Sequence, residues 1–458
     1  MRPDRRRLVT SPPCVAALLI AASAVLPGCP PSDDYFIETT ASGTGGSGSA
    51  GGSGATGGSG GSPIHTAGEG GAAAVGSSQG GASGAGGGAS GSGGGAGSGG
   101  SATTGWVAAS VPPGGFSPRE HSAFISIGNQ LFVWGGRNES GTALNSGALY
   151  DPRTDEWRMI ANDANTPSPR CEATAVWTGS VVVVWGGYEP ATERALSDGA
   201  VYDPVEDAWR AIADGPFARV APIGGGAEGR ALFWAGRDSE GSPLRGLDVY
   251  DIENDAWSFA DASEEPTLRE EAAWAVGMYT FWTYGGRLDA ESGSDRAAYY
   301  SMSQNEWNTL PEGATVPRWG SFGAFVGGNF YVWGGRDVST NFDDGVVFPL
   351  IDLESWAGID TSNAPSARYA AFGESGWVFP VDDESFVVVG GLEAAGDYLH
   401  DGAFYDTTED AWTALEAWPG SASHAFGAAG WVGGELVIWG GRDGDSLTNT
   451  GWRYRPPS

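Results

Sequence analysis

Arginine recurs at two fixed places along the C-terminal three quarters of the chain. One place directly follows a pair of small residues, usually Gly-Gly, and we call its members the strand-end set: Arg137, Arg237, Arg287, Arg336 and Arg442. The other place precedes the same pair by sixteen residues, or by 22 in one copy. These members form the strand-start set: Arg119, Arg170, Arg219, Arg269, Arg318 and Arg368, with His424 in the seventh copy. The planar guanidinium fork suits anions, so both sets predict a site for a carboxylate-bearing peptide, an acidic sugar or a phosphate.

The alternative is that the protein neutralises these arginines itself. Asp238, Asp337 and Asp443 each directly follow a strand-end arginine, and the surrounding segments carry many other carboxylates. Because the sequence does not say which way each side chain points, both interpretations stay open.

Two aromatic residues belong to the same candidate site. Trp319 follows Arg318, and Tyr369 follows Arg368. Aromatic faces can stack on a sugar or a peptide, and they can equally fill the protein interior. We therefore include Trp319 and Tyr369 among the candidate ligand-binding residues, with packing as the alternative.

Catalytic chemistry finds little support in the sequence. The region contains three histidines, His121, His400 and His424, and no spacing selects a pair of carboxylates for acid–base work. We find no zinc motif, calcium loop, phosphate-binding loop or nucleophile elbow. We therefore predict no catalytic residue, no metal and no cofactor.

The formal net charge is −32, and every basic residue is an arginine. A protein binds nucleic acid without sequence preference by neutralising phosphates with a cationic surface. This composition therefore argues against a nucleic-acid partner.

The elements that must position the arginines repeat about every 50 residues. In each copy an apolar run ends at a pair of small residues, and an aromatic residue follows the first of them by 14 to 16 positions. The aromatic residues are Tyr150, Tyr202, Tyr250, Tyr300, Phe348, Tyr405 and Tyr454. A tryptophan follows seven residues later in most copies, as Trp157 does after Tyr150. Continuous apolar runs such as Val181 to Trp185 indicate strands that are covered on both faces.

This pattern resembles the kelch repeat, and it covers residues 105–458 in seven copies. The resemblance implies an all-β, seven-bladed β-propeller in which each copy forms a four-stranded blade. It also implies that both arginine sets lie on the loop face that animal kelch substrate adaptors use to hold acidic peptides. Some kelch propellers are enzymes, resembling galactose oxidase or a bacterial periplasmic protein that interconverts sialic acid anomers. A carbohydrate-active enzyme is therefore the alternative function.

The seventh copy stops four residues after Tyr454 and lacks a fourth strand. Gly105-Trp106-Val107 has the character of an isolated fourth strand. We expect the segment 105–110 to complete blade seven, because closing the ring removes the open edges that favour aggregation.

The first 28 residues predict a signal peptide. Arg2, Arg5, Arg6 and Arg7 precede the short apolar stretch from Val15 to Val25, which is too short for a stable membrane span. Leu26-Pro27-Gly28-Cys29 resembles the lipobox of bacterial lipoproteins, in which the cysteine receives lipid; a plain secretory signal is the alternative. Residues 29–104, rich in Gly, Ser and Ala, read as a disordered linker.

Together these features predict an exported protein of the bacterial cell envelope that is tethered to a membrane through Cys29 alone. We expect a monomeric propeller that acts as a non-enzymatic binding module for a protein or glycan ligand. The Arg-bearing face makes an anionic ligand the preferred class.

Overall fold

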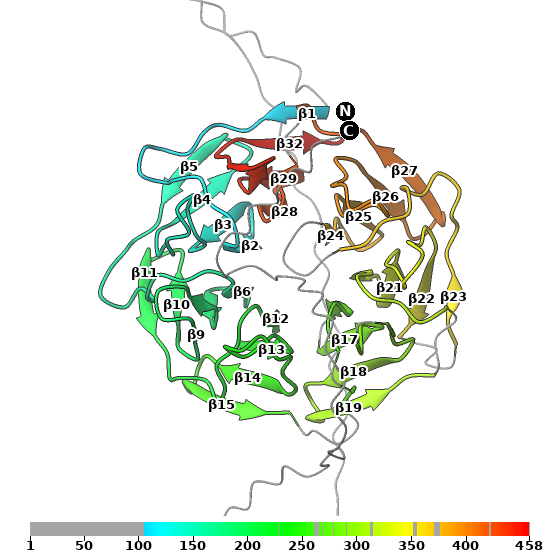
Figure 1. The fold of residues 1–458 in the computed structure, drawn as a ribbon, viewed down its shortest axis with the longest axis horizontal. Helices are drawn as coiled ribbons and strands as arrows, with labels where there is room; N and C mark the ends of the chain where they lie inside the picture. The colour runs from blue at the N-terminus through cyan, green and yellow to red at the C-terminus, as the bar shows by residue number, and fades with distance from the viewer. Residues whose placement is uncertain are drawn as a thin grey trace, which may run out of the picture. The chain divides into compact units, whose positions relative to one another are not determined.

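The computed structural model describes residues 105–457, except 228, 261–264, 268, 278, 290, 312–314, 351–354, 371–375 and 421–422. This part of the chain contains seven four-stranded antiparallel sheets arranged in a ring, and no helix (Figure 1). The predicted all-β, seven-bladed propeller is confirmed. No described segment forms a helix long and apolar enough to cross a membrane. The predicted signal peptide (1–28), the lipidation site Cys29 and the linker (29–104) lie outside the described residues.

Within a blade the four strands lie side by side, with the first strand at the centre of the ring and the fourth at its rim (Figure 1). Blades one and two comprise β2 (Ala123–Ile127), β3 (Gln130–Trp134), β4 (Gly147–Asp151) and β5 (Glu156–Met159), then β6 (Thr174–Trp177), β7 (Val182–Trp185), β10 (Gly199–Asp203) and β11 (Ala208–Ala211). Blades three and four comprise β12 (Ile223–Ala227), β13 (Arg230–Trp234), β14 (Leu247–Asp251) and β15 (Ala256–Phe259), then β16 (Ala273–Val276), β17 (Thr280–Tyr284), β18 (Ala297–Ser301) and β19 (Glu306–Thr309).

Blades five and six comprise β20 (Phe322–Val326), β21 (Asn329–Trp333), β22 (Gly345–Pro349) and β23 (Ala357–Gly358), then β24 (Trp377–Pro380), β25 (Ser385–Val389), β26 (Gly402–Asp406) and β27 (Ala411–Leu415). Blade seven comprises β28 (Ala428–Val432), β29 (Glu435–Trp439), β32 (Gly451–Arg455) and β1 (Gly105–Ala108). Two short hairpins, β8 (Tyr188–Glu189) with β9 (Arg194–Ala195) and β30 (Arg442–Asp443) with β31 (Ser446–Leu447), extend the loops of blades two and seven.

The core lies between neighbouring blades. All four residues of β7 are buried, and one apolar cluster joins side chains of blades one and two, including Phe132 and Val184. A strand that is covered on both faces has no solvent-facing side, so its sequence shows no polar alternation. This explains the continuous apolar runs of the second strands.

In blades one, two, three and six, the Tyr and Trp of the repeat fasten the blade to the linker that enters it. In blade one the Tyr150 hydroxyl donates to Oδ1 of Asp155 at 2.7 Å, and the same oxygen accepts the Ser110 N–H at 2.8 Å. The Trp157 indole then donates to the Ser110 carbonyl at 2.8 Å. Equivalent contacts recur around Asp207, Asp255 and Asp410. The spacing of the repeat therefore follows from a hydrogen-bonded rim as well as from packing.

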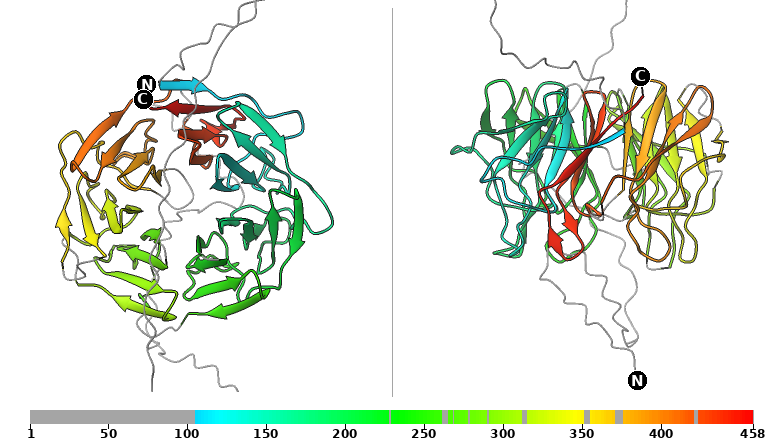
Figure 2. Two further views of the ribbon diagram at one scale, coloured as in Figure 1. Left: turned by 180° about the vertical axis from the view of Figure 1, so that it is seen from behind. Right: turned by 90° about the horizontal axis from the view of Figure 1, so that it is seen from above.

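The N-terminal strand β1 forms the outer strand of blade seven. It pairs with β32 in a register that places Trp106 opposite Tyr454, beside the C-terminus (Figures 1 and 2). The Trp106 indole donates to the Glu416 carbonyl at 2.7 Å, as the rim tryptophans of other blades do to their linkers. Trp106 thus supplies the repeat's tryptophan for blade seven from the other end of the propeller.

Candidate functional site at the centre of the ring

The strand-start arginines lie inside the protein. Their exposed fractions are at most 4%, and His424 is fully buried. Each guanidinium donates through Nη1 to the carbonyl of the first small residue of its own blade's pair, at 2.7 to 3.1 Å; these arginines are Arg119, Arg170, Arg219, Arg269, Arg318 and Arg368. Nδ1 of His424 lies 2.8 Å from the equivalent carbonyl of Gly440. This burial leaves no guanidinium surface for a ligand, so the strand-start set holds the loops of the blades together.

The second glycine of the small-residue pair forms a hydrogen bond with the next blade. The Gly136 N–H donates to the Arg170 carbonyl at 2.9 Å, and the same bond recurs at Gly187, Gly286, Gly335 and Gly441. Gly136 has φ of +86°, and a Cβ there would lie 2.6 Å from the Glu120 carbonyl oxygen. Only glycine fits both the backbone angle and the close approach.

Aspartate carboxylates form ion pairs with part of the strand-start set. Arg219 and Asp248 form an ion pair at 2.7 Å in which both side chains are fully buried. Burial raises the pKa of Asp248, and the neighbouring Arg219 opposes that shift. Arg170, Arg318 and Arg368 pair with more exposed aspartates, Asp198, Asp344 and Asp401.

Four members of the strand-end set share two glutamates. Glu120 accepts hydrogen bonds from Arg137 at 2.7 Å and from Arg442 at 2.5 Å, which joins blades one and seven. Glu270 similarly contacts Arg237 at 2.7 Å and Arg287 at 2.8 Å, joining blades three and four. Each of these four arginines is therefore paired with a carboxylate of the protein, as the alternative interpretation expected, and each glutamate serves two guanidinium groups.

Arg336 has a different environment. Trp319 takes the position that Glu120 and Glu270 occupy in their blades, since each forms a bridge with its blade's strand-end arginine. The guanidinium carbon of Arg336 lies 4.7 Å from the ring centroid of Tyr369 and 5.9 Å from that of Trp319. Trp319 is 5% exposed, whereas Arg336 and Tyr369 are half-buried. The structure therefore brings three of the sequence candidates together, with aromatic faces around a cation.

One residue from each blade forms a ring around the axis of the propeller, which we call the mouth ring. Its members lie two residues after the strand-start positions: His121, Glu172, Ala221, Glu271, Gly320, Ala370 and Phe426. Main-chain N–H groups of five members donate to the carbonyl of the member in the preceding blade at 2.7 to 3.0 Å. All members except Ala370 have positive φ, so the hydrogen-bonded ring holds non-glycine residues in a conformation that they rarely adopt.

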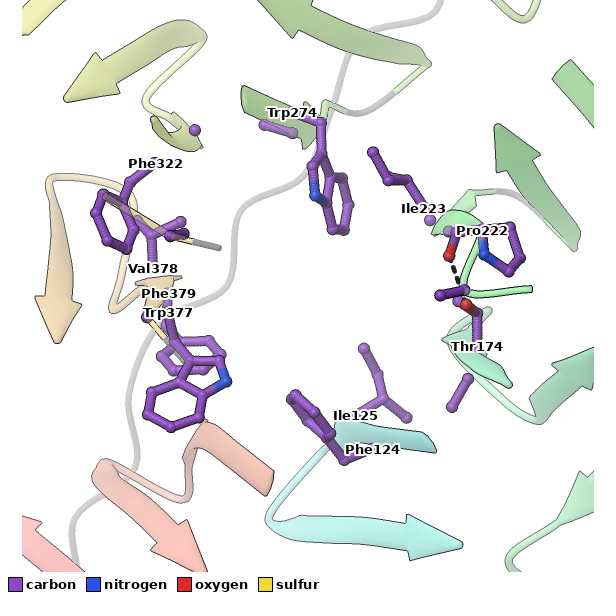
Figure 3. A pocket seen from close by; sticks show the side chains of 18 of the residues that line it. Phe124, Ile125, Thr174, Pro222, Ile223, Trp274, Phe322, Trp377, Val378 and Phe379 are labelled. Atoms are coloured by element: carbon purple, nitrogen blue, oxygen red, sulfur yellow. Dashed lines mark hydrogen bonds between the residues drawn. The ribbon is translucent and has the colours of Figure 1, made fainter. Parts of the chain in front are cut away.

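The mouth ring bounds a central cavity of about 610 Å³. The innermost strands form its wall, and Trp274 and Phe124 point into it from blades four and one (Figure 3). The Trp274 side chain is 37% exposed, which is unusual for an indole in a sheet that is otherwise packed. Most of the other lining is aliphatic, glycine or aromatic, so the cavity suits an apolar group.

This cavity was not predicted from the sequence. A signal was present five positions after the strand-start arginines of blades one, three, four and five, where the first-strand residue lines the cavity. It is Phe124 in blade one and Trp274 in blade four, but Gly224 and Gly323 in the two blades beside Trp274. The contrast between large aromatic residues and glycines at one register marks an asymmetric hollow.

Three titratable side chains lie on the mouth ring. Burial raises the pKa of Glu172 to about 7, although Arg137 and Arg237 oppose this shift. Burial lowers the pKa of His121 to about 3, and Arg137 adds to this shift. Burial also raises the pKa of Glu271, against the effect of Arg287. Near neutral pH the mouth ring therefore carries less negative charge than its composition indicates.

The rings of His121 and His400 contact aromatic side chains. The His121 ring is tilted against that of Phe426, with ring centroids 4.6 Å apart, and His400 stacks on Trp418 with centroids 5.1 Å apart. Among the described residues, no group of three or more His, Cys, Asp and Glu side chains is placed to hold a metal ion.

Seven four-stranded blades, the Gly pair and the Tyr–Trp rim together define a kelch-type β-propeller. The model of the KLHDC2/KLHL20/DRC7 Kelch-repeats domain matches residues 102–227 and 218–424. The chain belongs to this kelch-repeat family, which confirms the resemblance seen in its repeats.

Individual relatives match at lower identity. The chain is 31% identical to the F-box/kelch-repeat protein SKIP20 of Arabidopsis thaliana over 25% of this chain and 28% of the relative. It is 25% identical to Kelch domain-containing protein 3 of Bos taurus over 51% of this chain and 64% of the relative. It is 23% identical to human Kelch domain-containing protein 1 over 60% of this chain and 75% of the relative. A solved structure, that of YjhT, aligns with a TM-score of 0.49 at 15% identity, covering 67% of this chain and all of the other.

Proposed function

We propose that this propeller is a non-enzymatic binding module that holds part of another protein at the centre of its ring. The observation that carries this proposal is the central cavity of about 610 Å³ with Trp274 exposed on its wall. When a ligand covers a solvent-accessible indole in an apolar hollow, apolar surface is removed from water and the complex is stabilised. A kelch propeller fold is typical of protein-binding modules, and the cavity gives this one a specific place for contact.

The ligand class follows from the lining and from Arg336. A sugar needs several convergent polar groups, whereas this cavity presents mainly apolar surface, so a peptide with an apolar side chain fits better than a glycan. Arg336 lies beside Tyr369 and Trp319, whose next residues, Ala370 and Gly320, belong to the mouth ring. Gly320 and Ala370 carry the smallest side chains of the ring, together with Ala221. A peptide whose apolar side chain enters the cavity here can place a carboxylate on Arg336.

The cellular setting is part of the proposal. A basic start, a short apolar stretch and the lipobox-like Leu26-Pro27-Gly28-Cys29 support export and lipidation of Cys29. If the Gly-rich part of the linker, residues 41–104, behaves as a flexible chain, its roughly 64 residues would span roughly 45 Å root-mean-square, from about 5–6 Å times the square root of its length. A tethered propeller could thus capture partners throughout a volume near its membrane. Metabolic labelling with a fatty acid tests this point, since Cys29→Ala should abolish incorporation.

A peptide and glycan array tests the binding proposal with matched variants. Trp274→Ala removes the exposed indole, and Phe259→Ala removes a more exposed aromatic residue from the outer strand β15. Arg336→Gln removes the candidate anion contact, and Arg210→Gln removes an exposed arginine of β11 that pairs with Asp255. We expect wild type and both controls to bind the same acidic peptides, and W274A and R336Q to lose at least ten-fold in affinity.

Two outcomes would overturn the proposal. One is an array on which no peptide binds wild type better than W274A. The other is a set of ligands that are glycans alone, because that result would favour the carbohydrate-active alternative. Retained binding by R336Q with loss by W274A would remove the anionic contact and leave the cavity as the binding site.

A further inference from the structure

Glu172 and His121 occupy neighbouring positions on the mouth ring, in blades two and one. The Glu172 N–H donates to the His121 carbonyl at 3.0 Å, and Nδ1 of His121 lies 3.8 Å from Oε1 of Glu172. Both side chains line the central cavity, with exposed fractions of 7% for His121 and 17% for Glu172. The charge of this pair therefore contributes to the polarity of the cavity, together with Glu271 of the same ring.

The charged and titratable groups that face Glu172 are Arg137, Arg237, Glu120 and Tyr188, besides His121 itself. Arg137 is hydrogen-bonded to Glu120 at 2.7 Å, and Arg237 to Glu270 at 2.7 Å. The two nearest guanidinium groups are thus each engaged by another carboxylate. Burial outweighs their attraction and raises the pKa of Glu172 to about 7.

His121 does not provide a counter-charge for an ionised Glu172. Its imidazole lies against the ring of Phe426 and faces Arg137, Arg442 and Glu120. Burial and the two arginines lower the pKa of His121 to about 3, against the effect of Glu120. The imidazole is therefore neutral throughout the range in which Glu172 titrates.

We propose that the cavity takes an uncharged, largely apolar ligand group and that its binding is linked to a proton on Glu172. The protonated carboxyl leaves this end of the cavity uncharged and offers an O–H donor to an acceptor oxygen or nitrogen of the ligand. After ionisation, an apolar ligand covers a carboxylate that must give up water without a new partner, which opposes binding. This inference rests on the proposed function, because it requires the cavity to be the binding site.

The test uses Nile red, a neutral apolar fluorophore that carries acceptor atoms, titrated into the full-length protein from pH 5.5 to 8.5. If the ionised form does not bind, the affinity of wild type at pH 8.5 should be about 30-fold weaker than at pH 5.5. Glu172→Gln keeps the shape and a hydrogen-bond donor but cannot ionise. E172Q should bind within two-fold of the same affinity at every pH. Glu206→Gln, an exposed residue of the turn between β10 and β11, should behave as wild type.

The outcomes separate this inference from the proposed function. One-site binding by wild type with no pH dependence overturns the proton linkage and leaves the cavity as a binding site. Equal pH dependence in E172Q and wild type also overturns the assignment to Glu172. Failure of wild type to bind the dye at one site even at pH 5.5 overturns both proposals. Far-ultraviolet circular dichroism at each pH shows whether each variant remains folded during the titration.

Discussion

Trp106 lies opposite Tyr454 on the paired strands β1 and β32, with their ring centroids 5.3 Å apart. This contact joins the two ends of the propeller. Trp106→Ala should lower the free energy of unfolding by about 2 kcal/mol, because a large, partly buried side chain and an indole hydrogen bond are both lost. Deletion of residues 105–110 should have a much larger effect, since it exposes the edge of β32.

Thermal unfolding measures both changes, with Phe259→Ala as the control for loss of an exposed aromatic residue. An unchanged melting temperature after the deletion would show that β1 is dispensable for ring closure.

Gly136 tests the close contact between blades. Gly136→Ala places a methyl group 2.6 Å from the Glu120 carbonyl, at a positive φ of 86°. We expect a loss of about 2–3 kcal/mol in denaturant unfolding, because both the backbone strain and the clash oppose the native fold. Gly141→Ala is the matched control, since its φ of +77° is similar but no atom lies within 4 Å of the added methyl. Equal losses for the two variants would assign the effect to backbone angle alone.

For the strand-start arginines we predict that breaking a buried ion pair costs more stability than breaking an exposed one. Arg219→Met leaves the fully buried Asp248 without its partner, which should cost about 3–5 kcal/mol of stability. Arg210→Met breaks an exposed pair with Asp255 at 3.7 Å and should cost under about 1 kcal/mol. Urea unfolding compares the two directly. A small effect of R219M would contradict the structural role of the set.

Glu172 also makes stability depend on pH. Its folded pKa of about 7 lies above the ordinary value of 4.5, so the folded state binds this proton more tightly than the unfolded state. The stability gained from this proton is present at low pH and is lost as pH rises through about 7. The gain of E172Q over wild type should therefore grow between pH 5 and pH 8, by at most about 3 kcal/mol. Equal differences at pH 5 and pH 8 would show that Glu172 titrates normally.

The fold could be predicted from sequence because its signals are local and repeated. The Gly pair, the Tyr and the Trp recur at fixed spacings, and each has one structural role that the residue type itself suggests. Trp106 could be assigned to blade seven in the same way, because the seventh copy lacked its own fourth strand.

The candidate site was less predictable because side-chain direction decides it. Arg219 and Arg336 occur in equally regular patterns, yet one guanidinium is fully buried on Asp248 and the other lies against Tyr369. Sharing of Glu120 by Arg137 and Arg442 depends on closure of the ring between the first and last blades. The cavity could not be predicted because its wall combines a few positions from each of several strands that are distant in the sequence.

The central claim is that the propeller binds its ligand in the central cavity. The most direct test is a substitution that fills this cavity. Val378 of β24 lines the wall, and Val378→Trp should occupy the space that a ligand needs (Figure 3). Val205→Trp is the control, since Val205 is 86% exposed in a rim turn. The measurement is the affinity of Nile red at pH 5.5. We predict one binding site in wild type and V205W, and at least ten-fold weaker binding by V378W. Equal affinity of all three proteins would contradict a ligand site at the centre of the propeller.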